Sequence, residues 1–215
     1  MKKLPAAAAA TLAASPALAH HPLSGEPMTT FAHGLLSGVG HPILGFDHLF
    51  FVALMGIAAV YTGRALAAPA AYVAAMAAGV VLTTAGLALP MIETVVALSL
   101  LALGAIVLSG RALRLPAALA VFAGFGLFHG AAFGGALAGA EAGAGLSVLA
   151  GYLIALAIVQ YTIALVAGGI ARNVWHAADS TALQPRLAGA VVAGAGLLLT
   201  LERAEGALLA TLGWG

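Results

Sequence analysis

Long apolar runs, interrupted by short segments that hold the charged residues and helix breakers, dominate this chain. Six runs resemble membrane-crossing helices: 42–62, 69–89, 91–109, 116–138, 144–170 and 187–201. A helix needs about 20 apolar residues to cross a hydrocarbon core about 30 Å thick. The last run is short, so we expect its helix to continue past Glu202 and Arg203 toward Leu212, or the bilayer to thin there. The pattern predicts an all-α, polytopic membrane helix bundle with about six transmembrane helices.

The composition indicates that lipid is the solvent of this bundle. Of 215 residues, 63% are hydrophobic and only 7% are charged, whereas about a quarter of the residues of an ordinary soluble domain are charged. The formal net charge is +1 and no cluster of Lys or Arg is present, which argues against a nucleic-acid partner. The chain has no Cys, so disulfides and thiolate metal ligands are excluded.

The N-terminus has the pattern of a secretory signal peptide. Two lysines precede an Ala-rich apolar run that reaches an A-x-A cleavage pattern at residues 17–19. An uncleaved first helix is the alternative, but Pro5 and Pro16 leave an apolar run too short to cross a bilayer. We therefore expect residues 1–19 to be removed as a signal peptide and residues 20–215 to form a single transmembrane domain.

The basic residues predict the orientation of the bundle, because short cytoplasmic connections retain Lys and Arg. Five arginines fall in alternate connections and therefore on one side of the membrane: Arg64, Arg111, Arg114, Arg172 and Arg186. Only Arg203 departs from this pattern, and it stands beside two glutamates. We expect a multi-pass protein of a bacterial-type inner membrane, with both mature termini outside the cytoplasm.

Ionisable residues gather around the start of the first apolar run. The segment 33–55 reads HGLLSGVGHPILGFDHLFFVALM, and an ionisable group inside a membrane costs a few kcal/mol or more unless it is paired or hydrated. Pro42 suits the first turn of a helix, which would make His41 a cap residue at its mouth. On one continuous helix, His41 and His48 would share nearly the same face, with Asp47 offset by one position.

Imidazole and carboxylate suit nickel, cobalt or zinc better than soft copper. Asp47 could be a ligand or could orient a ligating imidazole. The alternative is a structural Asp and His pair that hydrogen-bonds the helix ends.

Two further ionisable residues could reach the same half of the bundle. Glu93 stands at the start of the third run, and His129 lies inside the fourth. A carboxylate stabilised by the helix dipole is the alternative for Glu93, and Gln160 could serve interhelical hydrogen bonding. Small residues would let neighbouring helices or a substrate approach the fourth helix closely: Gly124, Gly126, Gly130, Gly134 and Gly135.

Four segments carry a family resemblance. HPILGFDH at 41–48 resembles the H-P-x-x-G-x-D-H signature of the HupE/UreJ family of nickel and cobalt permeases. The stretches HGLLSGVG, LPMIETVVALS and FHGAAFGG stand in the order that this family shows. The resemblance implies uptake of a hydrated divalent metal ion for hydrogenase, urease or cobalamin pathways. It also implies metal-site residues, which are His41, Asp47, His48, Glu93 and His129.

The chain departs from the family at two positions of the fourth helix. The family's F-H-G-x-A-H-G-x-E motif begins at Phe128 and His129, but Phe133 stands where the second His is expected and Ala136 where the Glu is expected. Losing an imidazole and a carboxylate should lower the metal affinity or alter the metal preference, unless Glu141 or Gln160 substitutes.

The working hypothesis is a permease, not an enzyme, whose nickel or cobalt ion is a transported substrate and not a permanently bound cofactor. His20, His21 and His33 would recruit metal at the outer face. Uptake should decline on acidification, because protons compete for the ligands. No P-loop motif is present. The sequence leaves the oligomeric state open.

Two alternatives belong to other classes. A membrane metal chaperone or sensor would pass metal to metalloenzyme maturation proteins without transporting it. An intramembrane zinc hydrolase would use buried His and Asp to activate water. The sequence has no HExxH or GxSxG motif, and its Ser residues have no evident base partner.

Overall fold

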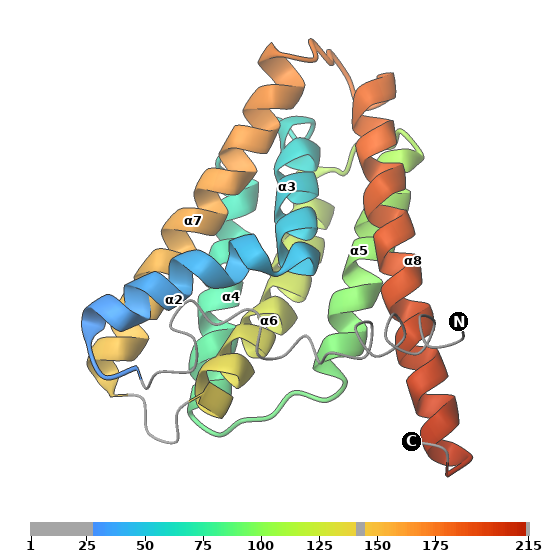
Figure 1. Cartoon of the computed structure of the whole chain (residues 1–215). Coiled ribbons are helices and arrows are strands. Elements are labelled where there is room, and N and C mark those ends of the chain that lie inside the picture. The colour runs from blue at the N-terminus through green and yellow to red at the C-terminus, as the bar shows by residue number, and fades with distance from the viewer. Residues whose placement is uncertain (1–27, 141–144, 214–215) are drawn as a thin grey trace, which may run out of the picture.

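The computed structural model describes residues 28–140 and 145–213, and all regular structure in these ranges is helical (Figure 1). The predicted signal peptide, His20, His21 and Glu141 lie outside the described residues. The fold class is confirmed as all-α. The described helices are α2 (Phe31–Leu44), α3 (Phe46–Val60), α4 (Ala67–Thr84), α5 (Ile92–Leu108), α6 (Leu115–Ala140), α7 (Leu146–Asn173) and α8 (Leu183–Thr211).

Each predicted apolar run corresponds to helical structure, but not every helix has the length of a membrane span. Among the described helices, α4, α6, α7 and α8 are long and apolar enough to cross a membrane. The bent pair α2 and α3 would make a fifth span if it is counted as one, and α5 is shorter, with 17 residues. The expected extension of the last run is present, because α8 continues to Thr211. The count of six spans stays a prediction.

The start of the first span differs from the prediction. Pro42 does not open a helix: it lies inside α2, which ends at Leu44. At Gly45 the axis turns by 78° and α3 begins with Phe46. The backbone N–H of Gly45 still bonds to His41 and its carbonyl accepts from Leu49, both at 2.9 Å, so the chain changes direction without losing these backbone hydrogen bonds.

Close backbone approach holds the helices in pairs. The closest partners are α4 with α6, α5 with α8, and α2 with α7, and α2 lies across α7 (Figure 1). Glycines stand where a side chain would strike the partner's backbone: Gly79 and Gly130 between α4 and α6, Gly104 and Gly189 between α5 and α8, Gly34 and Gly151 between α2 and α7. Small residues at such contacts are typical of membrane helix packing.

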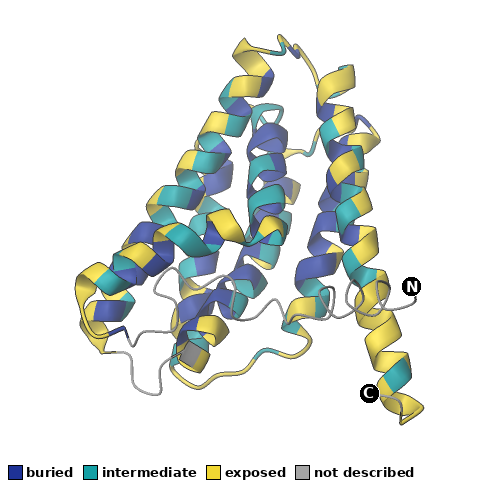
Figure 2. Ribbon diagram, in the orientation of Figure 1, coloured by how far each residue is buried: buried dark blue, intermediate teal, exposed yellow. Residues whose placement is uncertain are grey.

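The expected close approach of neighbouring helices to the fourth predicted helix, now α6, is present at three of its five glycines. Gly126, Gly130 and Gly134 face the backbone of α4, whereas Gly124 and Gly135 face open space. Figure 2 shows the same division for the whole bundle, with buried positions between the helices and exposed positions on their outer sides.

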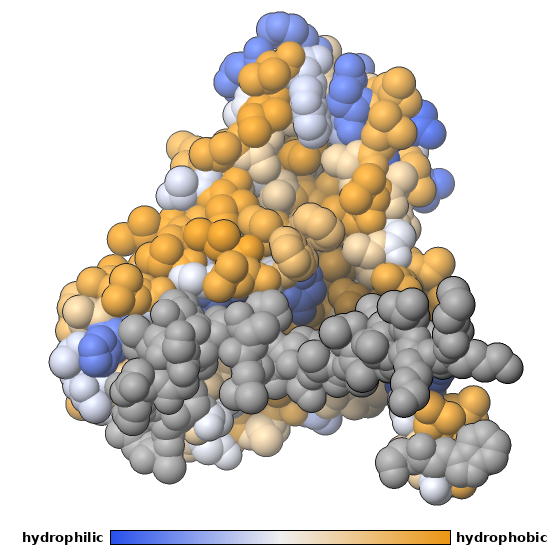
Figure 3. Space-filling model, viewed as in Figure 1, coloured by the Kyte–Doolittle hydropathy of each residue, from blue (hydrophilic) through white to orange (hydrophobic). Residues whose placement is uncertain are grey.

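One end of the bundle carries the arginine-bearing connections. The connections 61–66, 109–114 and 174–182 meet at the top of Figure 1, and hydrophilic atoms gather there in Figure 3. Arg186 donates to the carbonyl of Leu108 at 2.9 Å, which ties α8 to α5 at this end. Hydrogen bonds donated by Thr181, first from its hydroxyl and then from its backbone N–H, lower the pKa of the Asp179 carboxyl. We call this end the arginine end.

Single-cysteine labelling tests the expected orientation, because the natural chain has no Cys. Leu87 lies between α4 and α5, and Ala178 lies at the arginine end. Both residues are exposed, so each can be replaced by a cysteine that a reagent can reach. The positive-inside rule predicts that a membrane-impermeant maleimide labels Leu87→Cys in intact spheroplasts, and Ala178→Cys only after permeabilisation. The reverse pattern would show that the arginine end faces outward.

Substitution of Gly130 tests the packing of α4 on α6. A Cβ atom at Gly130 would strike the carbonyl of Met76, whereas one at Gly124 would meet open space. Both changes add the same methyl group to the same helix, so we expect Gly130→Ala to be less stable than Gly124→Ala by about 1–3 kcal/mol. Thermal unfolding in detergent measures the difference, and equal melting temperatures would contradict this packing.

Candidate functional site

Two imidazole rings meet inside the bundle. His48 belongs to the first turn of α3 and His129 to the middle of α6, and their Nδ1 atoms are 2.7 Å apart. His48 is 5% exposed and His129 is fully buried. A hydrogen bond at this distance needs a hydrogen on one nitrogen and a lone pair on the other. Each ring therefore satisfies a polar atom of the other in an apolar interior.

Ser99 of α5 completes the contacts of His129. Its Oγ lies 2.9 Å from His129 Nε2 and donates to the carbonyl of Val96 at 2.6 Å. Ser99 was not predicted as a site residue, because no Ser has an evident base partner in the sequence. The only signal was a hydroxyl in the apolar stretch VVALSLLALG, and the pairing itself depends on how α5 and α6 face one another.

Asp47 lies at the outer edge of the imidazole pair. Its Oδ1 accepts the backbone N–H of His48 at 2.9 Å and lies 3.9 Å from His48 Nε2. The Asp47 side chain is 28% exposed, against 7% for that of His48. The carboxylate therefore links the exposed surface to the buried ring, and it also accepts a backbone N–H in the first turn of α3, a contact of the kind that the structural alternative describes.

His41 reaches the same cluster across the break at Gly45. The ring centroids of His41 and His48 are 6.1 Å apart, and Phe133 contacts both rings, with centroid distances of 5.0 Å to His41 and 4.1 Å to His48. Tyr152 donates its hydroxyl to the carbonyl of Phe133 at 3.2 Å and lies 3.1 Å from His41 Nδ1. Tyr152 was not predicted as a site residue.

A residue larger than glycine at position 45 would be crowded by its neighbours. An added Cβ atom would lie 3.0 Å from His48 Cδ2 and 3.3 Å from Asp47 Oδ1. The break therefore leaves room for the two ionisable side chains that follow it.

A second polar pair lies on the arginine side of His129. Tyr72, in the second turn of α4, donates its hydroxyl to Gln160 Oε1 at 2.7 Å, and its ring centroid is 6.0 Å from that of His129. Both side chains are fully buried, and Gln160 Nε2 has no hydrogen-bond partner among the described residues. Polar atoms therefore follow one another from Asp47 through the imidazoles to Gln160.

Glu93 forms an ion pair at the surface of the bundle. Its carboxylate pairs with Arg203 of α8 at 3.0 Å, and these side chains are 55% and 51% exposed. The structure thus brings together His41, His48 and His129, with Asp47 at their edge, and places Glu93 in a surface ion pair. Within residues 28–140 and 145–213, no group of three or more His, Asp or Glu side chains is arranged to hold a metal ion. The role of Glu93 as a ligand stays a prediction.

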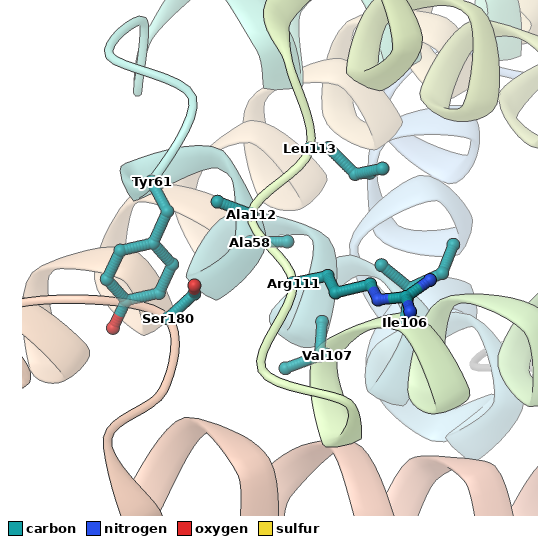
Figure 4. Close-up of a pocket in the computed structure, with 8 residues that line it drawn as sticks. All are labelled: Ala58, Tyr61, Ile106, Val107, Arg111, Ala112, Leu113 and Ser180. Carbon is teal, nitrogen blue, oxygen red and sulfur yellow. The ribbon is translucent and has the colours of Figure 1, made fainter.

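A small pocket lies at the arginine end, where α3 ends and the α5–α6 connection passes (Figure 4). Tyr61, Arg111 and Ser180 contribute its polar atoms, and its lining contains neither carboxylate nor imidazole. A guanidinium repels a divalent cation, so this pocket is not the candidate metal site.

Comparison with known proteins gives the following matches. A family model described as HupE / UreJ protein matches residues 8–199. The curated Protein HupE of Rhizobium leguminosarum bv. viciae is 40% identical over 101 residues, which is 46% of this chain and 53% of that relative. The match thus spans about half of the relative's length. No solved structure matches.

Proposed function

Because this chain belongs to the HupE / UreJ protein family, we propose that it imports a divalent transition-metal ion, nickel or cobalt, through the cluster around His48 and His129. One observation carries the proposal: two buried imidazoles bond to each other at 2.7 Å, and a partly exposed carboxylate stands 3.9 Å from one of them. Buried ionisable side chains in a membrane bundle are costly, and a pathway for ions is the usual reason to keep them.

The order of the side chains supports a direction of movement. A cation attracted by Asp47 would next meet His48 and then His129, which lies deeper. Neutral imidazoles and ionised carboxylates are the forms that bind metal, so acidification would oppose uptake. We place the arginine end in the cytoplasm, where metalloenzyme maturation proteins would receive the ion. The ion is the transported substrate, and the proposal includes no permanently bound cofactor.

We prefer transport to hydrolysis because the hydroxyl of Ser99 is not arranged as a nucleophile. The contact between Ser99 and His129 has the atoms of a Ser–His pair, but the hydroxyl hydrogen goes to the carbonyl of Val96. A nucleophilic Ser would give that hydrogen to the imidazole. Ser99 is also fully buried. A metal chaperone or sensor would use the same ligands as a permease, so only a transport measurement separates these two functions.

Uptake of radioactive nickel by proteoliposomes tests the proposal. We expect His48→Ala, His129→Ala and Asp47→Asn each to lower uptake about tenfold or more, because each removes a metal-binding atom or its negative charge. His176→Asn is the matched control: His176 is exposed, lies at the arginine end and has φ of 50°, a conformation that Asn tolerates. Its uptake should equal that of the natural protein.

Three outcomes would contradict the proposal. Natural protein that moves no more nickel or cobalt than empty vesicles is not a permease for these ions, and binding without uptake would favour the chaperone or sensor. Equal losses in His176→Asn and His48→Ala would show that the effect is not specific to the cluster. Hydrolysis of lipid or peptide that is lost in His129→Ala would favour an enzyme.

Substitution of Phe133 tests where the metal binds. Its ring contacts those of both His41 and His48, so Phe133→His would add an imidazole to the cluster. We expect nickel affinity, measured by calorimetry in detergent, to rise roughly tenfold, or about 1.4 kcal/mol. Phe122→His adds an imidazole at a buried position of the same helix, about three turns away, and should bring no gain. Equal gains at both positions would place the metal elsewhere.

A further inference from the structure

The hydroxyl of Ser99 has two neighbours and one hydrogen. The carbonyl of Val96, which can only accept, lies 2.6 Å from the Ser99 Oγ and receives that hydrogen. His129 Nε2, at 2.9 Å, therefore faces a lone pair of the Ser99 oxygen. Two lone pairs do not bond, so His129 carries its hydrogen on Nε2.

The tautomer of His129 determines that of His48. A neutral imidazole with a hydrogen on Nε2 has a lone pair on Nδ1. His48 Nδ1 lies 2.7 Å from that lone pair, so it must carry a hydrogen. The neutral His48 ring then has its own lone pair on Nε2, the nitrogen that lies 3.9 Å from Asp47 Oδ1.

The opposite arrangement fits the distances less well. A hydrogen on His48 Nε2 would gain no hydrogen bond from Asp47, because 3.9 Å between nitrogen and oxygen is too long for one. The same 3.9 Å separation leaves space between a nitrogen lone pair and a carboxylate oxygen, both of which are metal-binding groups.

We propose that Ser99 is a positioning residue, which acts through His129 to hold His48 in the tautomer whose free Nε2 lone pair faces Asp47 and receives the incoming metal ion. The metal part of this inference rests on the proposed function, whereas the tautomers concern the metal-free protein. Ser99 acts on His48 only through His129, because the ring of His129 stands between the Ser99 Oγ and His48.

Ring-nitrogen chemical shifts of isotope-labelled histidine in the metal-free protein test the tautomers. We expect a hydrogen on Nε2 of His129, whose signals are identified by their loss in His129→Gln, and on Nδ1 of His48. Ser99→Ala should give a mixture of tautomers, because His129 loses its acceptor, and Ser99→Thr should restore the natural pattern. Ser109→Ala is the matched control: Ser109 bonds to the carbonyl three residues earlier, as Ser99 does, but contacts no imidazole.

Nickel calorimetry on the same variants tests the metal part. Ser99→Ala should weaken binding about tenfold, as loss of a group that orients a ligand does, and both Ser99→Thr and Ser109→Ala should stay within about twofold. Reversed tautomers in the natural protein, or unchanged tautomers in Ser99→Ala, would overturn the inference even if nickel is transported. The expected tautomers in a protein that binds no nickel would instead overturn the metal part together with the proposed function.

Discussion

A hydrogen bond between two imidazoles in an apolar interior is the contact on which the rest of the site depends. A polar atom left unpaired there would cost about 2–7 kcal/mol, and the 2.7 Å contact between His48 and His129 avoids this for both rings. The helices that carry the two rings, α3 and α6, hardly pack on each other otherwise. Their separation is set by neighbours: α7 packs on α3, and α4 packs closely on α6. The glycines at those contacts therefore help to set the distance between the imidazoles.

The helices could be predicted from the apolar runs, but the break in the first one could not. The sequence HPILGFDH fits a helix that begins at Pro42 as well as one that contains it. At Gly45 the backbone has φ of −81°, which other residues also adopt, so no local conformational rule requires a turn there. The 78° bend follows from contacts that form only in three dimensions: α2 packs on α7, and the space beside Gly45 is filled by His48 and Asp47.

The sequence could predict those site residues whose ionisable side chains are costly to bury in an apolar bundle. Buried His and Asp stand out in an apolar chain, and His41, His48 and His129 do lie together. Ser99 and Tyr152 did not stand out, because a hydroxyl in a helix can bond to its own backbone and needs no further partner. Which way it points depends on the rotation of the helix. Glu93 shows the converse: its charge suggested a ligand, but the structure pairs it with Arg203, 110 residues away in the chain.

The two imidazoles bond to each other, and this affects how a metal ion could pass. The lone pair of His129 accepts the hydrogen bond from His48, so His129 must give up that bond before it binds metal, and this reduces the net gain from binding. The same hydrogen bond re-forms when the ion leaves, which favours release. Phe133 further limits the ligand set, since it packs an apolar ring against both His41 and His48. Under the proposed function, passage needs binding weak enough to be reversed, and self-paired imidazoles with one carboxylate at their edge meet that requirement better than a complete set of free ligands would.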